Sequence, residues 1–219
     1  PEAETLLAEL SKKNWNLTHI FNTHHHADHA GGNIAIKEAT ECLIIGPRAD
    51  ASRIPGIDKL VGDGDEFLLG GHPVRIFDTP GHTRGHIIYY LPEDGVAFVG
   101  DTLFAMGCGR LFEGTPAQMW NSLQKLTQLP DDTEIYCAHE YTQANARFAL
   151  SVEPGNQALI DRAREVDMLR ARNEPTVPTT LRLEKATNPF LRPMSLEIST
   201  NVGLGGGGTE EVDLVEVFA

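Results

Sequence analysis

The chain has 219 residues, and 18 lysines and arginines stand against 31 aspartates and glutamates, a formal charge of −13. Such a charge repels phosphate backbones and anionic lipid, which argues against nucleic acid or a membrane surface as a partner. No apolar run reaches the roughly 18 residues needed to cross a bilayer, and the first residues show no signal-peptide pattern. We therefore expect a soluble, cytoplasmic protein.

The length allows one large domain, or one domain with a small appendix. The three cysteines, Cys42, Cys108 and Cys137, are odd in number and form no CxxC pair. Neither a disulfide framework nor a thiolate zinc site is indicated by this pattern. Reduced thiols fit the expected cytoplasmic location.

Apolar periodicity predicts helices alternating with strands up to about residue 140. In chain order the expected elements are helix 2–13, strand 17–22, helix 32–40, strand 42–46, a hairpin over 66–74 that turns at two glycines, strands 74–77, 87–91 and 96–99, helix 115–129, and strand 135–138. Thr115 is the expected N-cap of its helix, with Pro116 at the first helical position.

From Tyr141 onward strand signals stop, and the pattern changes to helices over 145–152 and 156–172. The glycine run 205–208 is expected to be a loop before a last helix over 209–218. The sequence thus predicts a mixed α/β part followed by a helical appendix.

The strongest chemical signal is the segment Thr23-His24-His25-His26-Ala27-Asp28-His29, directly after an expected strand. A metal ion needs several neutral imidazoles and a carboxylate held together. Alternate positions leaving a strand lie on one side, so His24 and His26 are expected to face one point, and Asp28 and His29 a second point. The alternative, a solvated polar loop, accounts less well for the aspartate and the fourth histidine.

Three more polar segments also follow expected strands: Thr79-Pro80-Gly81-His82-Thr83, Gly100-Asp101-Thr102 and Ala138-His139-Glu140. Each of them alone could be an ordinary turn. Ligands in layered α/β folds gather at one edge of the sheet, which makes a coincidence of four strand-end clusters improbable. We therefore expect the four segments to share one site.

In order and spacing, these segments resemble the hydroxyacylglutathione hydrolase (glyoxalase II) branch of the metallo-β-lactamase superfamily. The motifs that carry the resemblance are Thr23-His24-x-His26-x-Asp28-His29, Pro80-Gly81-His82-Thr83, Gly100-Asp101-Thr102-Leu103-Phe104 and His139-Glu140-Tyr141-Thr142. The resemblance runs from about residue 2 to 193. It implies an α+β fold, with a four-layer αββα metallo-β-lactamase sandwich as catalytic domain over 1–145 and a helical glutathione-binding domain over 146–219.

The resemblance also implies a ligand set for two divalent metal ions. By it, the first ion is bound by His24, His26 and His82 and the second by Asp28, His29 and His139, while Asp101 bridges the pair together with a water or hydroxide. Asp28 and Asp101 are the residues expected to be catalytic. His19, His25, His72 and His86 match no ligand position and are expected to be structural or solvated. The all-His/Asp ligation suits zinc first, and also iron or manganese.

The segment Gly107-Cys108-Gly109-Arg110-Leu111-Phe112-Glu113-Gly114 indicates the branch within the superfamily. The resemblance implies that Arg110 and Phe112 contact the glutathione carboxylates, and that Tyr141 and Asn145 add further substrate contacts. Phe112 lacks the hydroxyl of the tyrosine often found there. For Arg110, the alternative is an ordinary surface arginine.

The implied reaction is hydrolysis of an S-(2-hydroxyacyl)glutathione thioester, typically S-D-lactoylglutathione, to glutathione and D-lactate in methylglyoxal detoxification. We expect a monomer that acts on this small molecule. Family members begin with several strands before the helix at 2–13 and end with a basic segment beyond 209–218. The resemblance therefore implies that this chain lacks N-terminal strands and part of the C-terminal domain.

Three alternatives stay open at this point. A persulfide dioxygenase shares the fold and uses one iron, but it would not need Asp28, His29 and His139. A lactonase or another thioester hydrolase of the superfamily is disfavoured by the segment 107–114. A non-catalytic metal-binding module is the third alternative. Turnover of S-lactoylglutathione against oxygen uptake with glutathione persulfide separates the hydrolase from the oxygenase.

Overall fold

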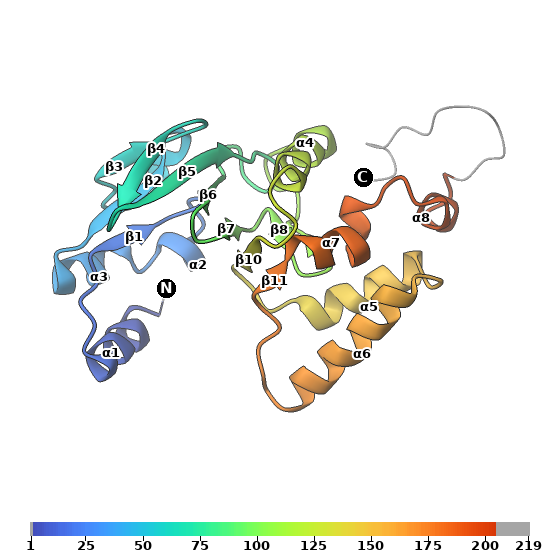
Figure 1. Ribbon diagram of the computed structural model, residues 1–219. Coiled ribbons are helices and arrows are strands. Elements are labelled where there is room, and N and C mark those ends of the chain that lie inside the picture. The colour runs from blue at the N-terminus through green and yellow to red at the C-terminus, as the bar shows by residue number, and fades with distance from the viewer. Residues whose placement is uncertain (1, 205–219) are drawn as a thin grey trace.

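The computed structural model describes residues 2–204, in which two β-sheets are flanked by helices (Figure 1). In chain order the elements are α1 (Ala3–Lys13), β1 (His19–Phe21), α2 (Ala27–Ala30), α3 (Asn33–Thr40), β2 (Leu43–Pro47), the 3-10 helix η1 (Arg48–Arg53), β3 (Lys59–Val61), β4 (Glu66–Leu69), β5 (His72–Asp78), β6 (Ile87–Leu91), β7 (Val96–Gly100), β8 (Leu103–Phe104), β9 (Gly107–Cys108), α4 (Pro116–Thr127), β10 (Glu134–Cys137), α5 (Thr142–Val152), α6 (Gln157–Ala171), β11 (Thr179–Thr180), α7 (Leu181–Thr187), η2 (Pro189–Leu191) and α8 (Leu196–Asn201).

The strands of the first sheet, in the order β1-β2-β3, are all parallel. The second sheet has six strands in the order β11-β10-β7-β6-β5-β4. Its central strands are antiparallel neighbours, except that β10 pairs with β7 in parallel. The short strands β8 and β9 form a separate hairpin.

Strand β6 shows how the layers are held together. Its residues alternate between two apolar cores: Ile87 and Tyr89 pack with residues of the first sheet such as Ile45, while Ile88 and Tyr90 pack with α4. Both faces of the larger sheet are therefore buried at β6. On the outer face of the first sheet, Ala30 of α2 packs against strand β2. The order of layers is helix, sheet, sheet, helix, as expected for the αββα sandwich.

Local chemistry explains two of the element boundaries. The hairpin between β4 and β5 turns at Gly70 and Gly71, whose φ angles of 59° and 98° favour glycine. Thr115 is the N-cap of α4, and its side chain and that of Gln118 form a reciprocal capping box. Both features confirm sequence-based predictions.

The C-terminal helices α5, α6 and α7 lie together beyond the β10–β11 edge of the larger sheet (Figure 1). The expectation that strands cease after Tyr141 is wrong, because β11 pairs antiparallel with β10. It is only two residues long, too short to produce a periodic pattern. The expected loop at 205–208 and helix at 209–218 lie outside the described residues. None of the helices in the described range is long and apolar enough to cross a membrane.

Candidate metal and substrate site

Strand direction brings three of the sequence-predicted segments together. Strands β5, β7 and β10 run the same way, because β6 is antiparallel to β5 and β7 while β10 is parallel to β7. Their carboxyl ends therefore meet at one edge of the sheet. His82 follows β5, Asp101 follows β7 and His139 follows β10.

The fourth segment follows β1 of the other sheet. His24 and His26 lie in the loop between β1 and α2, and Asp28 and His29 are consecutive residues of the single turn of α2. The loop and the helical turn that follows it direct the side chains of one short segment at two neighbouring points.

Gly100 turns the chain from β7 towards Asp101. Its φ of 49° lies in the left-handed region, and a Cβ atom there would lie 2.5 Å from Thr23 Oγ1 and 2.8 Å from His86 Nε2. Any side chain at this position would collide with both. The glycine of the motif is thus required by close packing at the start of the site.

The three histidines His24, His26 and His82 form one cluster. His24 Nε2 and His82 Nε2 each lie 3.1 Å from His26 Nδ1. His82 donates its Nδ1–H to the carbonyl oxygen of Arg110 at 2.8 Å, which leaves Nε2 unprotonated and facing the cluster. Three imidazole nitrogens with converging lone pairs are the donor set of a metal ion.

The second cluster contains Asp28, His29 and His139. His139 Nε2 lies 3.4 Å from Asp28 Oδ2, and His29 Nε2 lies 3.6 Å from the same oxygen. Asp101 stands between the clusters: its Oδ2 is 3.4 Å from both His82 Nε2 and His139 Nε2. One carboxylate therefore reaches both groups of histidines.

Two atoms at this junction indicate that the donors fit metal ions. His29 Nε2 and Asp101 Oδ1 are buried and 3.2 Å apart, yet neither makes a hydrogen bond. Buried polar atoms without a partner are rare in native proteins and call for an ion or water that completes them. The chemistry of the donors, neutral imidazoles and carboxylates, suits divalent ions.

The protonation states of the site favour metal binding. Burial lowers the pKa values of His24, His26 and His82, with the neighbouring imidazoles adding to the effect at His24 and His26. Burial alone would raise the pKa of Asp101, but the neighbouring imidazoles of His29, His139 and His82 outweigh it and lower that pKa. Neutral imidazoles around an ionised carboxylate are the forms that bind cations.

His86, which matched no ligand position, supports Asp101 from behind. Its Nε2 accepts the backbone N–H of Asp101 at 3.1 Å, so the proton sits on Nδ1, 3.0 Å from Thr79 Oγ1. Full burial lowers the pKa of His86 to about 3 and keeps the ring neutral. The expectation that His86 is structural agrees with this position, but the sequence carries no signal that its contact is with Asp101.

His25 likewise belongs to a supporting network and not to the clusters. Its Nδ1 donates to the buried carboxylate of Asp50 at 2.9 Å, and Arg53 bonds both Asp50 and Glu113. Glu113 also accepts the backbone N–H of Arg84 at 2.9 Å. The segment 110–114 is thereby tied to the first histidine loop. The roles of Asp50, Arg53 and Glu113 depend on contacts between distant segments, which the sequence did not reveal.

A cavity of about 530 Å³ opens over the two clusters. Besides His26, Asp28, His82, Asp101 and His139, it is lined by all four residues predicted to contact substrate, Arg110, Phe112, Tyr141 and Asn145. Phe112 and Tyr141 are half exposed or more, and each packs against a histidine of the clusters, Phe112 against His82 and Tyr141 against His139. Five of the seven predicted metal ligands thus line the same cavity as the four predicted substrate contacts.

Comparison with known proteins agrees with this geometry. Residues 1–139 match the family model "Metallo-beta-lactamase superfamily", and residues 140–219 match "Hydroxyacylglutathione hydrolase C-terminus". A hydroxyacylglutathione hydrolase of Maricaulis maris is 57% identical over 97% of this chain and 83% of its own length. One from Methylococcus capsulatus is 53% identical over 99% of this chain and 83% of its own length.

A solved structure, TTHA1623 in a di-iron-bound form, has a TM-score of 0.64 and is 25% identical, with 87% of this chain and 86% of that chain covered. The fold, the donor clusters and both halves of the sequence thus lead to the same assignment. The chain belongs to the hydroxyacylglutathione hydrolase family of the metallo-β-lactamase superfamily, and it is a hydrolase.

Proposed function

We propose that this chain hydrolyses S-(2-hydroxyacyl)glutathione, with S-D-lactoylglutathione as its typical substrate, at two divalent metal ions. His24, His26 and His82 would hold one ion, Asp28, His29 and His139 the other, and Asp101 both. The observation that carries the proposal is the position of Asp101, whose Oδ2 lies 3.4 Å from a histidine of each cluster. Zinc is the first candidate, with iron or manganese as alternatives. The similar structure in a di-iron-bound form supports iron as one of these alternatives.

When bound, two such ions lower the pKa of a bound water and polarise the substrate carbonyl. The chain's own residues hold and orient the reactants. His82, fixed through its Nδ1–H on the carbonyl of Arg110, and Asp101, fixed through its N–H on His86, keep their donor atoms aimed at the cavity. Such preorganisation removes the need to reorder the site during the reaction.

Substrate recognition is proposed to come from the cavity wall. Glutathione carries two carboxylates, and the strongly acidic chain must locally reverse its field to bind them. Arg110 is exposed and lines the cavity, where its guanidinium is able to bind a carboxylate in two hydrogen bonds. Phe112 and Tyr141 offer aromatic faces beside the clusters, and Asn145 is a half-buried residue of the wall.

The test uses purified protein loaded separately with zinc, iron and manganese. Loss of the thioester and release of free thiol from S-D-lactoylglutathione should follow metal content, which should approach two ions per chain by elemental analysis. Glutathione persulfide with an oxygen electrode is the control for an oxygenase. Oxygen uptake without thiol release would reverse the proposal, and no turnover of either substrate would favour a metal-binding module.

Location, oligomeric state and the domain division are also proposals. We propose a cytoplasmic monomer, and the acidic charge and the free thiols suit that compartment. The domain division at residues 145 and 146 stays a prediction. Gel filtration with light scattering measures the oligomeric state directly.

A further inference from the structure

The tip of the β8–β9 hairpin is bound by side chains from the C-terminal part of the chain. Asn188 Nδ2 donates to the carbonyl oxygens of Phe104, at 3.1 Å, and Gly107, at 2.9 Å. Met106 donates its backbone N–H to Glu184 Oε2 at 2.9 Å, and the carbonyl of Ala105 accepts from Asn145 at 3.0 Å. Four consecutive residues of a buried turn thus have a backbone group satisfied from outside the hairpin.

Met106 shows that this turn needs external support. Its φ of 57° is left-handed, a conformation that residues with a side chain rarely adopt. Its side chain is completely buried among residues of α5 and α6, including Ala149 and Leu159. The hairpin is therefore held in an unfavourable conformation by packing and hydrogen bonds from the helical part.

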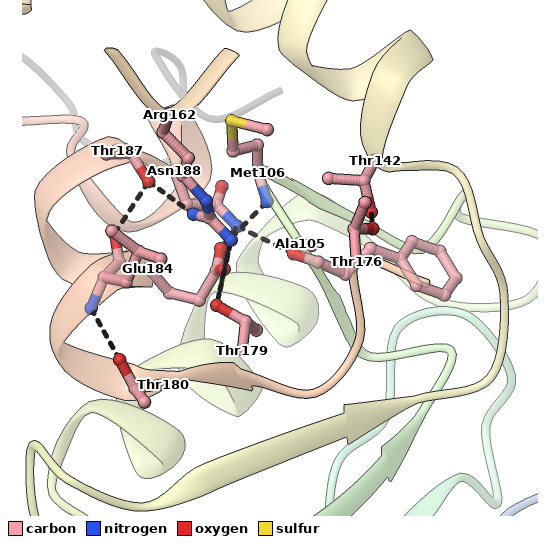
Figure 2. Close-up of polar contacts among 12 residues, drawn as sticks. Ala105, Met106, Thr142, Arg162, Thr176, Thr179, Thr180, Glu184, Thr187 and Asn188 are labelled. Carbon is pink, nitrogen blue, oxygen red and sulfur yellow. Dashed lines mark hydrogen bonds and ion pairs between the residues drawn. The ribbon is translucent and has the colours of Figure 1, made fainter. Parts of the chain in front are cut away.

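Glu184 is anchored in turn by a buried network (Figure 2). The carboxylate has no exposed surface, and its other oxygen accepts hydrogen bonds from Arg162 and from Thr179 Oγ1. Asn188 Nδ2 also reaches Glu184 Oε2 at 3.0 Å. A buried carboxylate is tolerated only with its partners in place, so Glu184 has little freedom to move.

The hairpin joins this network to the metal site. Asp101 lies two residues before β8, and Gly109 follows β9 so closely packed on Asp101 that a Cβ atom there would lie 1.8 Å from its carbonyl oxygen. The next residue, Arg110, gives its carbonyl to His82 Nδ1 and its side chain to the cavity. A shift of the hairpin would therefore displace three groups together: Asp101, the Arg110 carbonyl that holds His82, and the Arg110 side chain that lines the cavity.

We propose that Asn188 and Glu184 are positioning residues that set the hairpin, and through it Asp101, His82 and Arg110, for the reaction. This inference rests on the proposed function for its kinetic consequence. The claim that the C-terminal helices hold the hairpin in place is tested without substrate, by amide exchange and zinc affinity.

Thr187 provides a matched control for Asn188. It is also fully buried and belongs to the same network, accepting from Arg162 and donating to the carbonyl of Leu183, but it makes no hydrogen bond to the hairpin. Thr187→Val keeps its shape and removes those bonds. Asn188→Ala leaves the Thr187 bonds in place and removes the two bonds to Phe104 and Gly107, together with those to Glu184 and to the Phe190 N–H.

The experiment compares both variants with the parent protein, and denaturation in urea gives the stability of each. In Asn188→Ala, we expect amide exchange of the peptide over 101–110 to rise at least ~10-fold beyond that of Thr187→Val. Zinc affinity, from competition with a chelator, should fall by ~10-fold or more, as is typical when support of a metal ligand is lost. The value of kcat/KM should fall by up to ~100-fold, the loss that misplacement by about 1 Å produces.

Equal exchange in 101–110 and equal zinc affinity in the two variants, at matched stability, would overturn the positioning role. The two variants could instead differ in exchange and zinc affinity while the parent protein shows no thioesterase activity. That result would reject the proposed function and keep the inference. If Asn188→Ala does not fold, Asn188→Ser, which leaves a smaller cavity, takes its place in the same comparison.

Discussion

His86 offers a test of whether the backbone of Asp101 must be held for the metal site to form. Glutamine places its terminal atoms near the position of His Nε2, whereas asparagine reaches only the position of Nδ1. His86→Gln therefore keeps an acceptor for the Asp101 N–H, now 3.1 Å from Nε2, and gives up the contact with Thr79. His86→Asn does the reverse, so the pair of variants separates the two hydrogen bonds.

The expected difference follows from burial. Asp101 is 5% exposed and His86 is completely buried, so water cannot replace the lost acceptor in His86→Asn. An unsatisfied buried N–H costs ~1–3 kcal/mol. We expect the metal-free His86→Asn protein to be less stable than His86→Gln by that amount in urea denaturation. Loss of such a supporting group also weakens metal binding by roughly 10–100-fold.

Zinc affinity is measured for both variants by competition with a chelator, and His86→Gln should retain most of it. If the two variants have the same stability and the same zinc affinity, the Asp101 N–H has no need of His86. The position of Asp101 would then depend on the turn at Gly100 alone.

Three further predictions concern residues of the site itself. Asp101→Ala should abolish most thioester hydrolysis and reduce bound metal below two ions per chain, and near-normal turnover with two ions would rule out a bridging role. Arg110→Ala should raise KM for S-D-lactoylglutathione by roughly tenfold, since a charge-assisted hydrogen bond contributes about 1.5–3 kcal/mol, with a smaller change in kcat. An unchanged KM would place the glutathione moiety elsewhere. The hydrogen bond from Arg53 lowers the pKa of Glu113 to about 2, so the stability that this carboxylate contributes is complete above its ordinary pKa of 4.5 and is lost as pH falls from there to about 2. Glu113→Gln should therefore lower the free energy of unfolding, measured in urea, by about 1 kcal/mol at neutral pH, a value that allows for solvent screening. Near pH 2 the substitution should have no effect on stability. An equal loss at both pH values would exclude the ion pair as its cause.

The convergence of the histidines and aspartates could be predicted from the sequence because their positions follow a simple rule. Each segment that carries them comes soon after a strand, and strands have a local signature of apolar and β-branched residues. His82, Asp101 and His139 meet because β5, β7 and β10 share a direction. The family resemblance then supplied the pairing of ligands, which strand positions alone do not give.

Residues that support the site from a distance could not be predicted in this way. Glu184 and Asn188 lie about 80 residues from the hairpin that they bind, at separations of 78 for Met106 and 81 for Gly107. In the sequence they are ordinary polar residues of a helix and its end. Only the packing of α7 on the hairpin gives them partners. The contact between His86 and Asp101 likewise forms only in the folded chain, between segments whose contact the sequence does not indicate.

Strand β11 limits the exchange of the regions 1–139 and 140–219 between relatives by recombination. The two family models meet between residues 139 and 140, yet Thr179 and Thr180 from the second region complete the sheet of the first by pairing with Ile135 and Glu134. Leu181 continues from this strand into the apolar core under α4. A chimera spliced at residue 139 would therefore join an edge strand and a core residue from one parent to the sheet of the other. Relatives that differ at the β10 edge should not exchange these halves freely, even where each half matches its own family model.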